Sequence, residues 1–316
     1  MARIGDRDEM EAFVRSVELG GFSAAARDLG LTPSALSKLV TRLESALGAR
    51  LLNRTTRKLT PTAEGGLFLA RCRRILAEIE DAENEIGRAR DCPQGTLRLH
   101  VGVGFGTHQL VPALPRFIER YPEIRVELIV EDRTLNLVKE GIDIAVRPGP
   151  PSDASLIARK VCEFERVVCA SPEYLARYGE PRTPDDLGKH SCITRAGEPA
   201  LSRWSFDTPS GRRVVDVAGS ISANNAECVL QFAILGLGIV RLNEFIVSDD
   251  IRNGRLVPVL AHLHCAEPVS MHALYQHDRR RLPRVAAMLD FLVESFQDAP
   301  WRTMAAKTKR RESRHK

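Results

Sequence analysis

The sequence predicts a multidomain protein: an all-α helix-turn-helix with a basic wing, a long linker helix, and an α/β domain. Three observations predict it. Residues 6–60 hold three short amphipathic segments, residues 61–91 repeat apolar positions at steps of four and three, and residues 97–260 alternate strand-like and helix-like segments. At 316 residues, with 43% hydrophobic and 28% charged residues, the chain has the size and composition of a globular protein with more than one domain.

The first sixty residues predict a helix, a turn and a helix, preceded by one more helix. Asp6, with a glutamate three residues later, is a capping-box pattern ahead of the first helix. Ser23 is expected to cap a short second helix, and Gly30 supplies the left-handed residue that ends it. Thr32 is expected to cap a third helix with Pro33 at its first position, where a missing N–H costs nothing.

The third helix separates an apolar face from a polar face when each residue is advanced by about 100°. Its apolar face can pack on the preceding helices. Its polar face carries hydroxyls and cations, which suit base edges and phosphates in the major groove of DNA. A solvated face is the alternative, but the short helix before it and the basic hairpin after it favour a DNA contact. The polar-face residues are Ser34, Ser37, Lys38, Thr41 and Arg42.

A basic two-stranded wing is expected over residues 51–60, where apolar anchors alternate with cations. Arg54, Arg57 and Lys58 could bind phosphate or reach into the minor groove. The positive charge of this segment supports DNA binding better than the net charge of the whole chain does. The chain carries +5, but residues 301–316 contribute +6, so the preceding 300 residues sum to −1. We expect those last sixteen residues to form a basic, disordered tail.

A long linker helix is expected over residues 61–91, capped by Thr60 and begun by Pro61. Its apolar positions form a heptad seam, which is typical of a coiled coil. A coiled coil implies a two-fold dimer, and a two-fold dimer reads an inverted repeat. The alternative is one long helix packed on its own domain. The seam residues are Phe68, Cys72, Ile75, Ile79, Ala82, Ile86 and Ala89.

An α/β domain is expected over residues 92–300, beginning with a hinge at residues 92–95. Strand and helix alternate, which indicates a parallel sheet. A second unit of the same kind is expected over residues 165–260, and a closing helix over residues 284–296. The first unit's expected strands are residues 97–103, 126–130 and 142–146, with helices at residues 110–121 and 135–140.

An ordered run of motifs fills the N-terminal sixty positions, among them Gly21-Phe22-Ser23-Ala24-Ala25-Ala26 and Leu51-Leu52-x-Arg54-Thr55-Thr56-Arg57. The run resembles the LysR-type transcription regulators, and it is far more specific than a short motif. At Lys38 the family often has arginine, and lysine cannot form the bidentate fork that reads guanine. We also expect Ser23 to contact DNA. The resemblance implies DNA contacts at Pro33, Ser34, Ser37, Lys38, Thr41, Arg42, Arg54 and Arg57.

The α/β region resembles the same family at residues 110–117, 121–124, 137–147, 170–175 and 236–239. The resemblance implies an effector domain with the two-lobed fold of periplasmic solute-binding proteins. It also implies control by a small-molecule effector and assembly into dimers or tetramers. If the chain is an activator, RNA polymerase is a further expected partner.

The crevice at the carboxyl ends of strands is the usual ligand site of open α/β sheets, and helix N-termini there attract anions. Residues 104–107 and 223–225 qualify, and two arginines could add positive charge. We expect a small carboxylate-bearing or aromatic effector. The alternative is that Thr107 and Asn224 are ordinary helix caps and both arginines are surface residues. The expected effector-binding residues are Phe105, Gly106, Thr107, Arg147, Arg195, Asn224 and Asn225.

Several special sites fit the sequence less well. Gly102, Gly104 and Gly106 follow a strand, but dinucleotide spacing would need a glycine at position 107. Cys162 and Cys169 lie in apolar runs, which disfavours a thiol redox sensor. Four histidines and a cysteine match no known zinc spacing, so no metal is expected. These are His262, His264, His272, His277 and Cys265.

Other classes of protein are also disfavoured. No nucleophile, base or metal constellation indicates an enzyme, and no cofactor is expected. A solute-binding protein would need a signal peptide and has no use for a basic helix-turn-helix. No apolar stretch approaches the ~20 residues that span a bilayer, so a cytoplasmic protein without membrane contact is expected. The seven dispersed cysteines are expected to be thiols.

Overall fold

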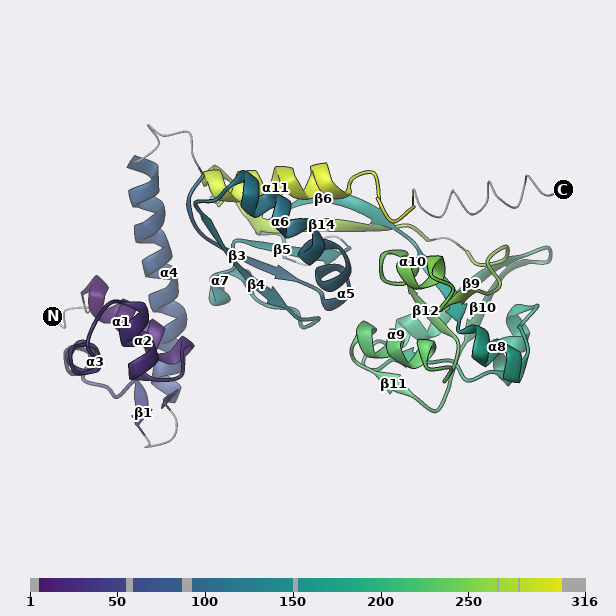
Figure 1. Ribbon diagram of the computed structural model, residues 1–316, viewed down its shortest axis with the longest axis horizontal. Coiled ribbons are helices and arrows are strands. Elements are labelled where there is room, and N and C mark those ends of the chain that lie inside the picture. Colours follow the sequence, from purple (N-terminus) through teal and green to yellow (C-terminus); the bar gives the residue numbers. More distant parts are fainter. Residues whose placement is uncertain are drawn as a thin grey trace. The chain divides into compact units, whose positions relative to one another are not determined.

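The computed structural model describes residues 6–54, 59–86, 93–149, 153–265, 267–277 and 279–302. Two compact units are present, and each is described by itself (Figure 1). The first comprises Met1–Gly95 with Leu135–Ile142, and the second comprises Thr96–Thr134 with Asp143–Lys316. Within the described ranges, no helix is long and apolar enough to cross a membrane.

Three helices share one core in the first unit: α1 (Arg7–Glu18), α2 (Phe22–Asp28) and α3 (Pro33–Leu47). The predicted N-terminal caps of α1 and α3 are confirmed. Asp6 and Glu9 form a complete capping box at the start of α1. The Thr32 hydroxyl accepts a hydrogen bond from the Ala35 backbone N–H at 3.2 Å. Gly48 ends α3 in the left-handed conformation, with a φ of 66°.

The predicted start of the second helix is wrong. α2 begins at Phe22 with Gly21 as its N-cap, and Ser23 is the second residue of the helix rather than its cap. The earlier start places the Phe22 side chain against the core of the unit. Burial of an aromatic ring contributes more than the ~1 kcal/mol typical of a side-chain cap, so packing decides where this helix begins.

The base of the wing consists of two strands, β1 (Leu52–Arg54) and β2 (Leu59–Pro61), which pair antiparallel with Asn53 opposite Thr60. Residues 55–58 lie outside the described ranges. The pairing explains why the predicted cap of the linker helix is wrong. Thr60 and Pro61 belong to β2, so the helix cannot begin until the strand has ended.

The linker helix α4 (Ala63–Ile86) therefore starts two residues later than predicted. The Thr62 hydroxyl accepts a hydrogen bond from the Gly65 backbone N–H at 2.9 Å, which makes Thr62 the capping residue. A Cβ atom at Gly65 would collide with the backbone carbonyl of Leu51. Glycine at this position therefore allows α4 to lie directly against the start of the wing.

The first half of the predicted seam packs on the chain's own helices. Cys72 is fully buried, and Phe68 and Ile75 are partly buried against the core of α1 to α3. The Phe68 ring lies 6.0 Å from the ring of Phe13. The alternative of a helix packed on its own domain thus holds for this half. The other half stays a prediction, because the side chains at 82 and 86 and all of residue 89 lie outside the described part.

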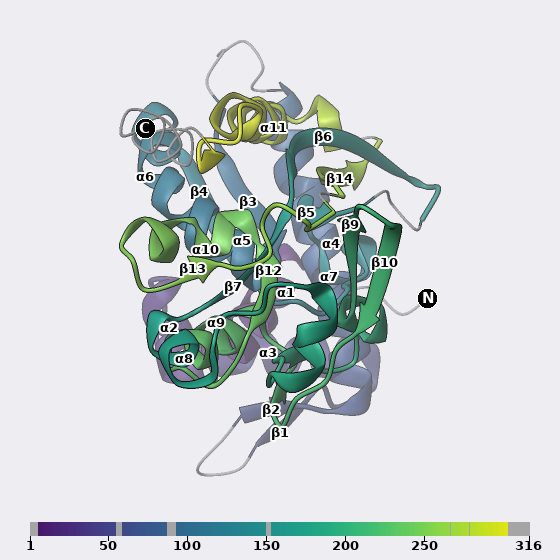
Figure 2. The same ribbon diagram turned by 90° about the vertical axis from the view of Figure 1, so that its right-hand side faces the viewer.

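The second unit consists of two lobes (Figures 1 and 2). The first lobe has a five-stranded sheet in the order β4-β3-β5-β14-β6. β3 and β5 run parallel, but β14 is antiparallel to both β5 and β6. The predicted parallel pairing is confirmed for β3 and β5, but the sheet as a whole is mixed, because the chain returns from the second lobe as β14 and enters the sheet between β5 and β6. The strands are β3 (Gly95–Val101), β4 (Ile124–Val130), β5 (Ile144–Pro148), β6 (Leu156–Phe164) and β14 (Val269–Gln276).

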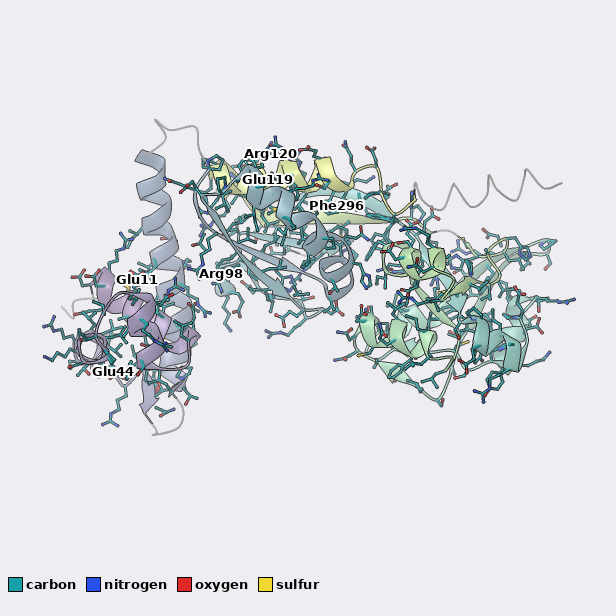
Figure 3. The ribbon with its side chains drawn as sticks, viewed as in Figure 1. Glu11, Glu44, Arg98, Glu119, Arg120 and Phe296 are labelled. Carbon is teal, nitrogen blue, oxygen red and sulfur yellow. The ribbon has the colours of Figure 1, made fainter. Side chains whose placement is uncertain are left out.

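Helical segments cover this sheet. After β3, the chain runs through α5 (Val103–Phe105), a π-helical turn (Gly106–Leu110) and α6 (Val111–Arg120) without a break. The strand thus ends two residues earlier than predicted, and the helix starts earlier. The closing helix is confirmed as α11 (Pro283–Phe296). Its Glu294 pairs at 2.8 Å with Arg120 of α6, which is labelled in Figure 3. The short helix α7 (Leu137–Glu140), which belongs to the first unit, is capped by Asn136.

The second lobe, residues 165–268, is built from three small sheets. β7 lies between β12 and β13 with both neighbours antiparallel, β9 and β10 form a hairpin, and β8 pairs parallel with β11. The strands are β7 (Arg166–Ala170), β8 (Thr194–Arg195), β9 (Arg203–Thr208), β10 (Gly211–Asp216), β11 (Ser222–Ala223), β12 (Val240–Asn243) and β13 (Val257–Pro258). The helices are α8 (Pro172–Tyr178), α9 (Ala226–Ile234) and α10 (Glu244–Arg252), with 3-10 turns at Pro184–Lys189 and Pro199–Ser202.

An aromatic cluster joins the two lobes. Phe105 of α5 packs edge-on against Phe245 of α10, with ring centroids 5.4 Å apart. Phe105 also lies 5.0 Å from Phe296 at the end of α11, which is labelled in Figure 3. Trp301 completes the cluster, 5.6 Å from Phe245. The next residue, Arg302, binds Glu244 of α10 at 2.8 Å. The segment that follows α11, Trp301 and Arg302, is therefore attached to the second lobe.

Candidate DNA-binding face and effector cavity

Helix α3 presents the polar face that the sequence predicts. Its opposite face is closed, since Leu36, Val40 and Leu43 are fully buried in the core of the first unit. Advancing by 100° per residue therefore separated the two faces correctly. The exposed residues of the polar face are Pro33, Ser34, Lys38, Thr41 and Arg42, with Ser37 half-buried beside them.

The cations of this face are free within the described part of the chain. Lys38 and Arg42 are exposed and form no ion pair there. The Thr41 hydroxyl donates to the Ser37 carbonyl at 2.8 Å, so its proton is used within the helix and its oxygen can only accept. Ser23 is exposed on α2. The side chain of Arg54 and all of Arg57 lie outside the described residues, so their DNA contacts remain predictions.

Glu44 positions the wing, a role that the sequence analysis missed. Its Oε1 atom accepts hydrogen bonds from the backbone N–H groups of Leu51 at 2.9 Å and Leu52 at 3.1 Å. Glu44 lies on α3 in the first unit (Figure 3), so these bonds fix the entry to β1 against the recognition helix. The only acidic residue in the basic segment is thus bound to backbone and does not neutralise Lys38 or Arg42. The signal available in the sequence was that Glu44 stands alone among the basic residues of this segment.

A cavity of about 270 Å³ lies in the second unit and is lined by both lobes. Three of the predicted effector-binding residues line it: Phe105 and Arg147 from the first lobe and Arg195 from the second. Four do not. Two further arginines of the second lobe, Arg166 and Arg241, line it and were missed.

The four residues outside the cavity have other positions. Gly106 is buried against the sheet, where a Cβ atom would press on Val101 and Val130. Thr107 and Asn224 are exposed. Asn225 caps α9, and its Oδ1 atom accepts the backbone N–H groups of residues 227 and 228 at 2.7 and 3.4 Å. The first free N–H groups of that helix are therefore occupied by the protein's own side chain.

Arg147 lies at the end of β5 without a carboxylate partner in the described ranges. Its Nη2 atom is 3.4 Å from Nδ1 of His100, and its Nε atom is buried without a hydrogen-bond partner. Burial, followed by the charge of Arg147, lowers the pKa of His100 to about 4. His100 is therefore neutral near pH 7 and adds no charge, which leaves the Arg147 guanidinium to attract an anion.

Arg195, in contrast, is already neutralised. Its Nη2 atom lies 2.6 Å from a Glu198 carboxylate oxygen and 3.4 Å from an Asp132 oxygen. Asp132 belongs to the first lobe and Arg195 to the second, so this ion pair bridges the lobes beside the cavity that both residues line. The predicted contribution of Arg195 to the positive charge is thus offset by two carboxylates.

Arg166 and Arg241 come together through strand pairing. In the antiparallel pair of β7 and β12, Arg166 is opposite Asn243, which places Arg241 diagonally across on the same face. The Arg241 Nε atom donates to His264 Nε2 at 3.0 Å, while its Nη2 atom is buried without a hydrogen bond. Burial, and next the charge of Arg166, lowers the pKa of Arg241 to about 10. Arginines inside apolar strands were the signal that sequence analysis passed over.

The structure gives no support to the thiol redox sensor or the metal site considered in the sequence analysis. Cys162 and Cys169 are buried, and burial raises the pKa of each thiol to about 12, opposite to the shift that makes a thiol reactive. His264 accepts a hydrogen bond from Arg241, and His272 Nδ1 lies 2.8 Å from the carbonyl of Gly149. Among the residues described, no three His, Cys, Asp or Glu side chains are grouped to hold a metal ion.

Comparisons with known proteins cover almost the whole chain. A family model described as a bacterial regulatory helix-turn-helix protein of the lysR family matches residues 8–66, and the LysR substrate binding domain matches residues 90–297. The transcriptional regulator CrgA of Neisseria meningitidis is 37% identical over 289 residues, covering 92% of this chain and 96% of CrgA. DmlR of Escherichia coli K12 is 33% identical over 292 residues, covering 92% and 94%.

Solved structures agree. The structure of CrgA aligns with a TM-score of 0.62 at 37% identity over 90% of this chain and 97% of CrgA. The full-length virulence activator AphB of Vibrio cholerae aligns with a TM-score of 0.60 at 27% identity, covering 92% and 99%. The chain therefore belongs to the LysR family: it is a DNA-binding transcription regulator with an effector-binding domain, and not an enzyme.

Proposed function

We propose that this regulator binds an interrupted inverted repeat as a dimer or tetramer and is controlled by a small anionic effector held in the cavity of the second unit. The observation that carries the effector part is Arg147, a half-buried guanidinium that faces a cavity and has no carboxylate partner in the described ranges. An uncompensated buried charge is unfavourable, so an anion that pairs with it gains affinity.

On the DNA side, the polar face of α3 enters the major groove. Ser34 and Ser37 contact bases or phosphates, and the free cations Lys38 and Arg42 bind phosphate oxygens or guanine. Pro33, Thr41 and the exposed Ser23 lie beside them at the groove edge. The wing arginines Arg54 and Arg57 add contacts to the flanking backbone.

Two copies are needed to read an inverted repeat, because the symmetry of the site mirrors the symmetry of the protein. The second half of the linker segment, residues 61–91, supplies the dimer contact, and four chains form a tetramer on two repeats. The protein acts in the cytoplasm, and as an activator it would contact RNA polymerase.

The effector is small. The cavity of about 270 Å³ falls just under the ~300–1,000 Å³ range of drug-sized ligand pockets. Phe105, Phe164 and Phe245 line it and can cover the apolar part of a short metabolite. Binding alters DNA affinity only through its differential affinity for two states of the protein. Closure of the lobes, which Asp132 and Arg195 already bridge, is the source of that difference.

One experiment tests the DNA part. The full chain is used to select binding sites from a random DNA pool, and we expect inverted half-sites about one helical turn apart, or a multiple of it. Enrichment of a single half-site without symmetry would contradict the proposed arrangement. The Ser37→Ala and Lys38→Ala variants should weaken binding to the selected site without lowering the melting temperature, because both side chains lie opposite the buried leucines.

A second experiment tests the effector part. Thermal shift of the full chain is measured against a panel of short carboxylates and their neutral amides, since a ligand of the native state raises its melting temperature. We expect shifts with carboxylates only, and their loss in Arg147→Met. Arg125→Met is the matched control, because Arg125 is exposed on β4 and lies outside the cavity. Equal shifts with the amides would overturn the anionic effector.

A further inference from the structure

Resting on the proposed function, we infer that the effector carries two negatively charged groups, one held by Arg147 in the first lobe and the other by Arg166 and Arg241 in the second. A short dicarboxylate is the chemical class that fits. The inference goes beyond an anionic effector because it specifies the number of charges and the lobe that binds each.

The cations of the cavity form two separate groups. Arg147 lies on β5 with His100 as its neighbour. Arg166 and Arg241 lie on β7 and β12 of the other lobe, on one face of the strand pair. Burial lowers the pKa of both Arg147 and Arg241; the charge of Arg166 lowers the pKa of Arg241 further, whereas the charge of Glu131 raises that of Arg147.

The carboxylates that line the cavity form no ion pair with Arg147 or Arg166, although the charge of Glu131 acts on Arg147 and that of Glu198 on Arg166. Asp132 and Glu198 are both bound to Arg195, and Glu131 lies 3.6 Å from Arg133. In the described part of the chain, Arg147 and Arg166 have no carboxylate within 4 Å. Arg241 has only a long contact of 3.9 Å with Glu267. One negative group can compensate one of these sites and leaves the other unpaired.

Unused hydrogen-bond donors are present at both sites. His100 is 1% exposed, and because its Nδ1 atom accepts from Arg147, the ring proton is on Nε2, which has no partner. On the other side, the Arg241 side chain is 4% exposed and its Nη2 atom has no hydrogen bond. A buried donor without a partner is unfavourable, so a carboxylate oxygen that reaches one of these donors gains affinity.

The distance between the two charges must be short enough for a cavity of this size. Aromatic rings from both lobes line the same cavity and would contact a short methylene chain. A ligand that binds one lobe at each end stabilises the arrangement in which both lobes approach it. This gives a dianion the differential affinity for a closed state that a monoanion on one lobe lacks.

The test compares diacids with monoacids on the full chain. Affinities are measured by calorimetry for malonate, succinate, glutarate and adipate, each against the monoacid with the same number of carbons and against its own half-amide. We expect one diacid to bind at least tenfold more tightly than its monoacid and its half-amide. Inorganic phosphate, a compact dianion that cannot reach both lobes, should bind no better than the monoacids.

Substitutions of the cavity arginines test which of them binds each negatively charged group of the ligand. Arg147→Gln and Arg166→Gln should each reduce the affinity of the preferred diacid to that of the monoacid, and the double variant should bind neither. Arg241→Gln serves as a third variant, used if its melting temperature without ligand shows that it folds. Arg125→Gln is the exposed control and should bind as the natural chain does.

The outcomes separate this inference from the proposed function. Equal affinity for diacids and monoacids, with loss in Arg147→Gln alone, would overturn the two-charge inference and leave the anionic effector standing. Phosphate that binds as tightly as the best diacid would also overturn it. If no carboxylate binds and only neutral ligands do, the proposed effector and this inference both fail.

Discussion

The two units differ in how far their cations are exposed to solvent. On α3, Lys38 and Arg42 are exposed to solvent, while in the second unit the Arg241 side chain is 4% exposed and Arg147 is half-buried. Exposed charges suit DNA, an extended polyanion that releases its counterions when it is bound. Buried charges suit a discrete ion that must match their geometry, and salt screens them less. The same residue type thus serves two kinds of recognition.

The largest expected effect is a difference in salt dependence. If six or more phosphates are contacted, DNA affinity should fall by about 10³-fold or more between 50 and 200 mM salt. Effector affinity should fall less than tenfold over the same range, because its charges are shielded from ions. Anisotropy with the selected DNA site and calorimetry with the preferred acid measure the two. Parallel salt slopes would show that the cavity cations are not buried in solution.

A smaller effect is expected from removing the exposed cations. The Lys38→Ala, Arg42→Ala double variant should reduce DNA affinity by roughly 10- to 100-fold and lower the salt slope by about two units if both residues bind phosphate. A lost preference for one base at an unchanged slope would instead assign base reading. Effector binding should be unaffected. Arg71→Ala, at an exposed site on α4, is the control.

Removal of the Glu44 carboxylate should have a more local effect. Glu44→Ala leaves the N–H groups of Leu51 and Leu52 without their acceptor, at a cost of about 1 kcal/mol or more. Their hydrogen exchange should accelerate about tenfold, with a modest loss of DNA affinity as the wing loosens. Glu44→Gln keeps an acceptor oxygen and should lie between. Unchanged exchange in Glu44→Ala would mean that the wing is held by other contacts.

The smallest effect concerns pH. Burial, then neighbouring arginine charge, lowers the pKa of His100 and of His264 to about 4 from 6.5. The unfolded chain therefore binds protons that the folded chain does not, and the second unit should lose stability as pH falls from 6.5 towards 4. The first 99 residues contain no histidine, so the first unit should lack this dependence above pH 5.

Variants separate the histidines that cause this loss. His264→Gln should flatten the decline between pH 6.5 and 5 by up to about 1 kcal/mol, since glutamine can still accept from Arg241. His262→Gln, at an exposed site, should leave the decline unchanged. Melting temperatures across this pH range measure it. Identical curves for both variants would place the proton uptake elsewhere.

The first unit was predictable because its signals are local. Thr32, Gly48 and the leucines of α3 lie within one helix, where spacing alone separates the faces. The errors arose where contacts from outside decided a boundary. Phe22 packs into the core and moves the start of α2, and β2 pairing holds Pro61 out of the linker helix. Local capping preferences of about 1 kcal/mol are easily outweighed by such contacts.

The cavity was predictable only in part. Phe105 and Arg147 follow or end predicted strands, so their place near the carboxyl edge of the sheet could be inferred. Arg166 and Arg241 meet through an antiparallel register between strands more than seventy residues apart. No local pattern encodes that register. The same limit applies to β14, whose entry between β5 and β6 depends on the return of the chain from the other lobe.

The position of Trp301 allows its fluorescence to report on the cavity. The chain has two tryptophans. Trp204 is buried in a separate core of the second lobe, whereas Trp301 packs on Phe105 and Phe245, whose rings line the cavity. Indole emission responds to the polarity and packing of its surroundings, so a Trp204→Phe protein would fluoresce from one site only. Filling of the cavity could then be followed in real time on unlabelled protein, free or bound to DNA.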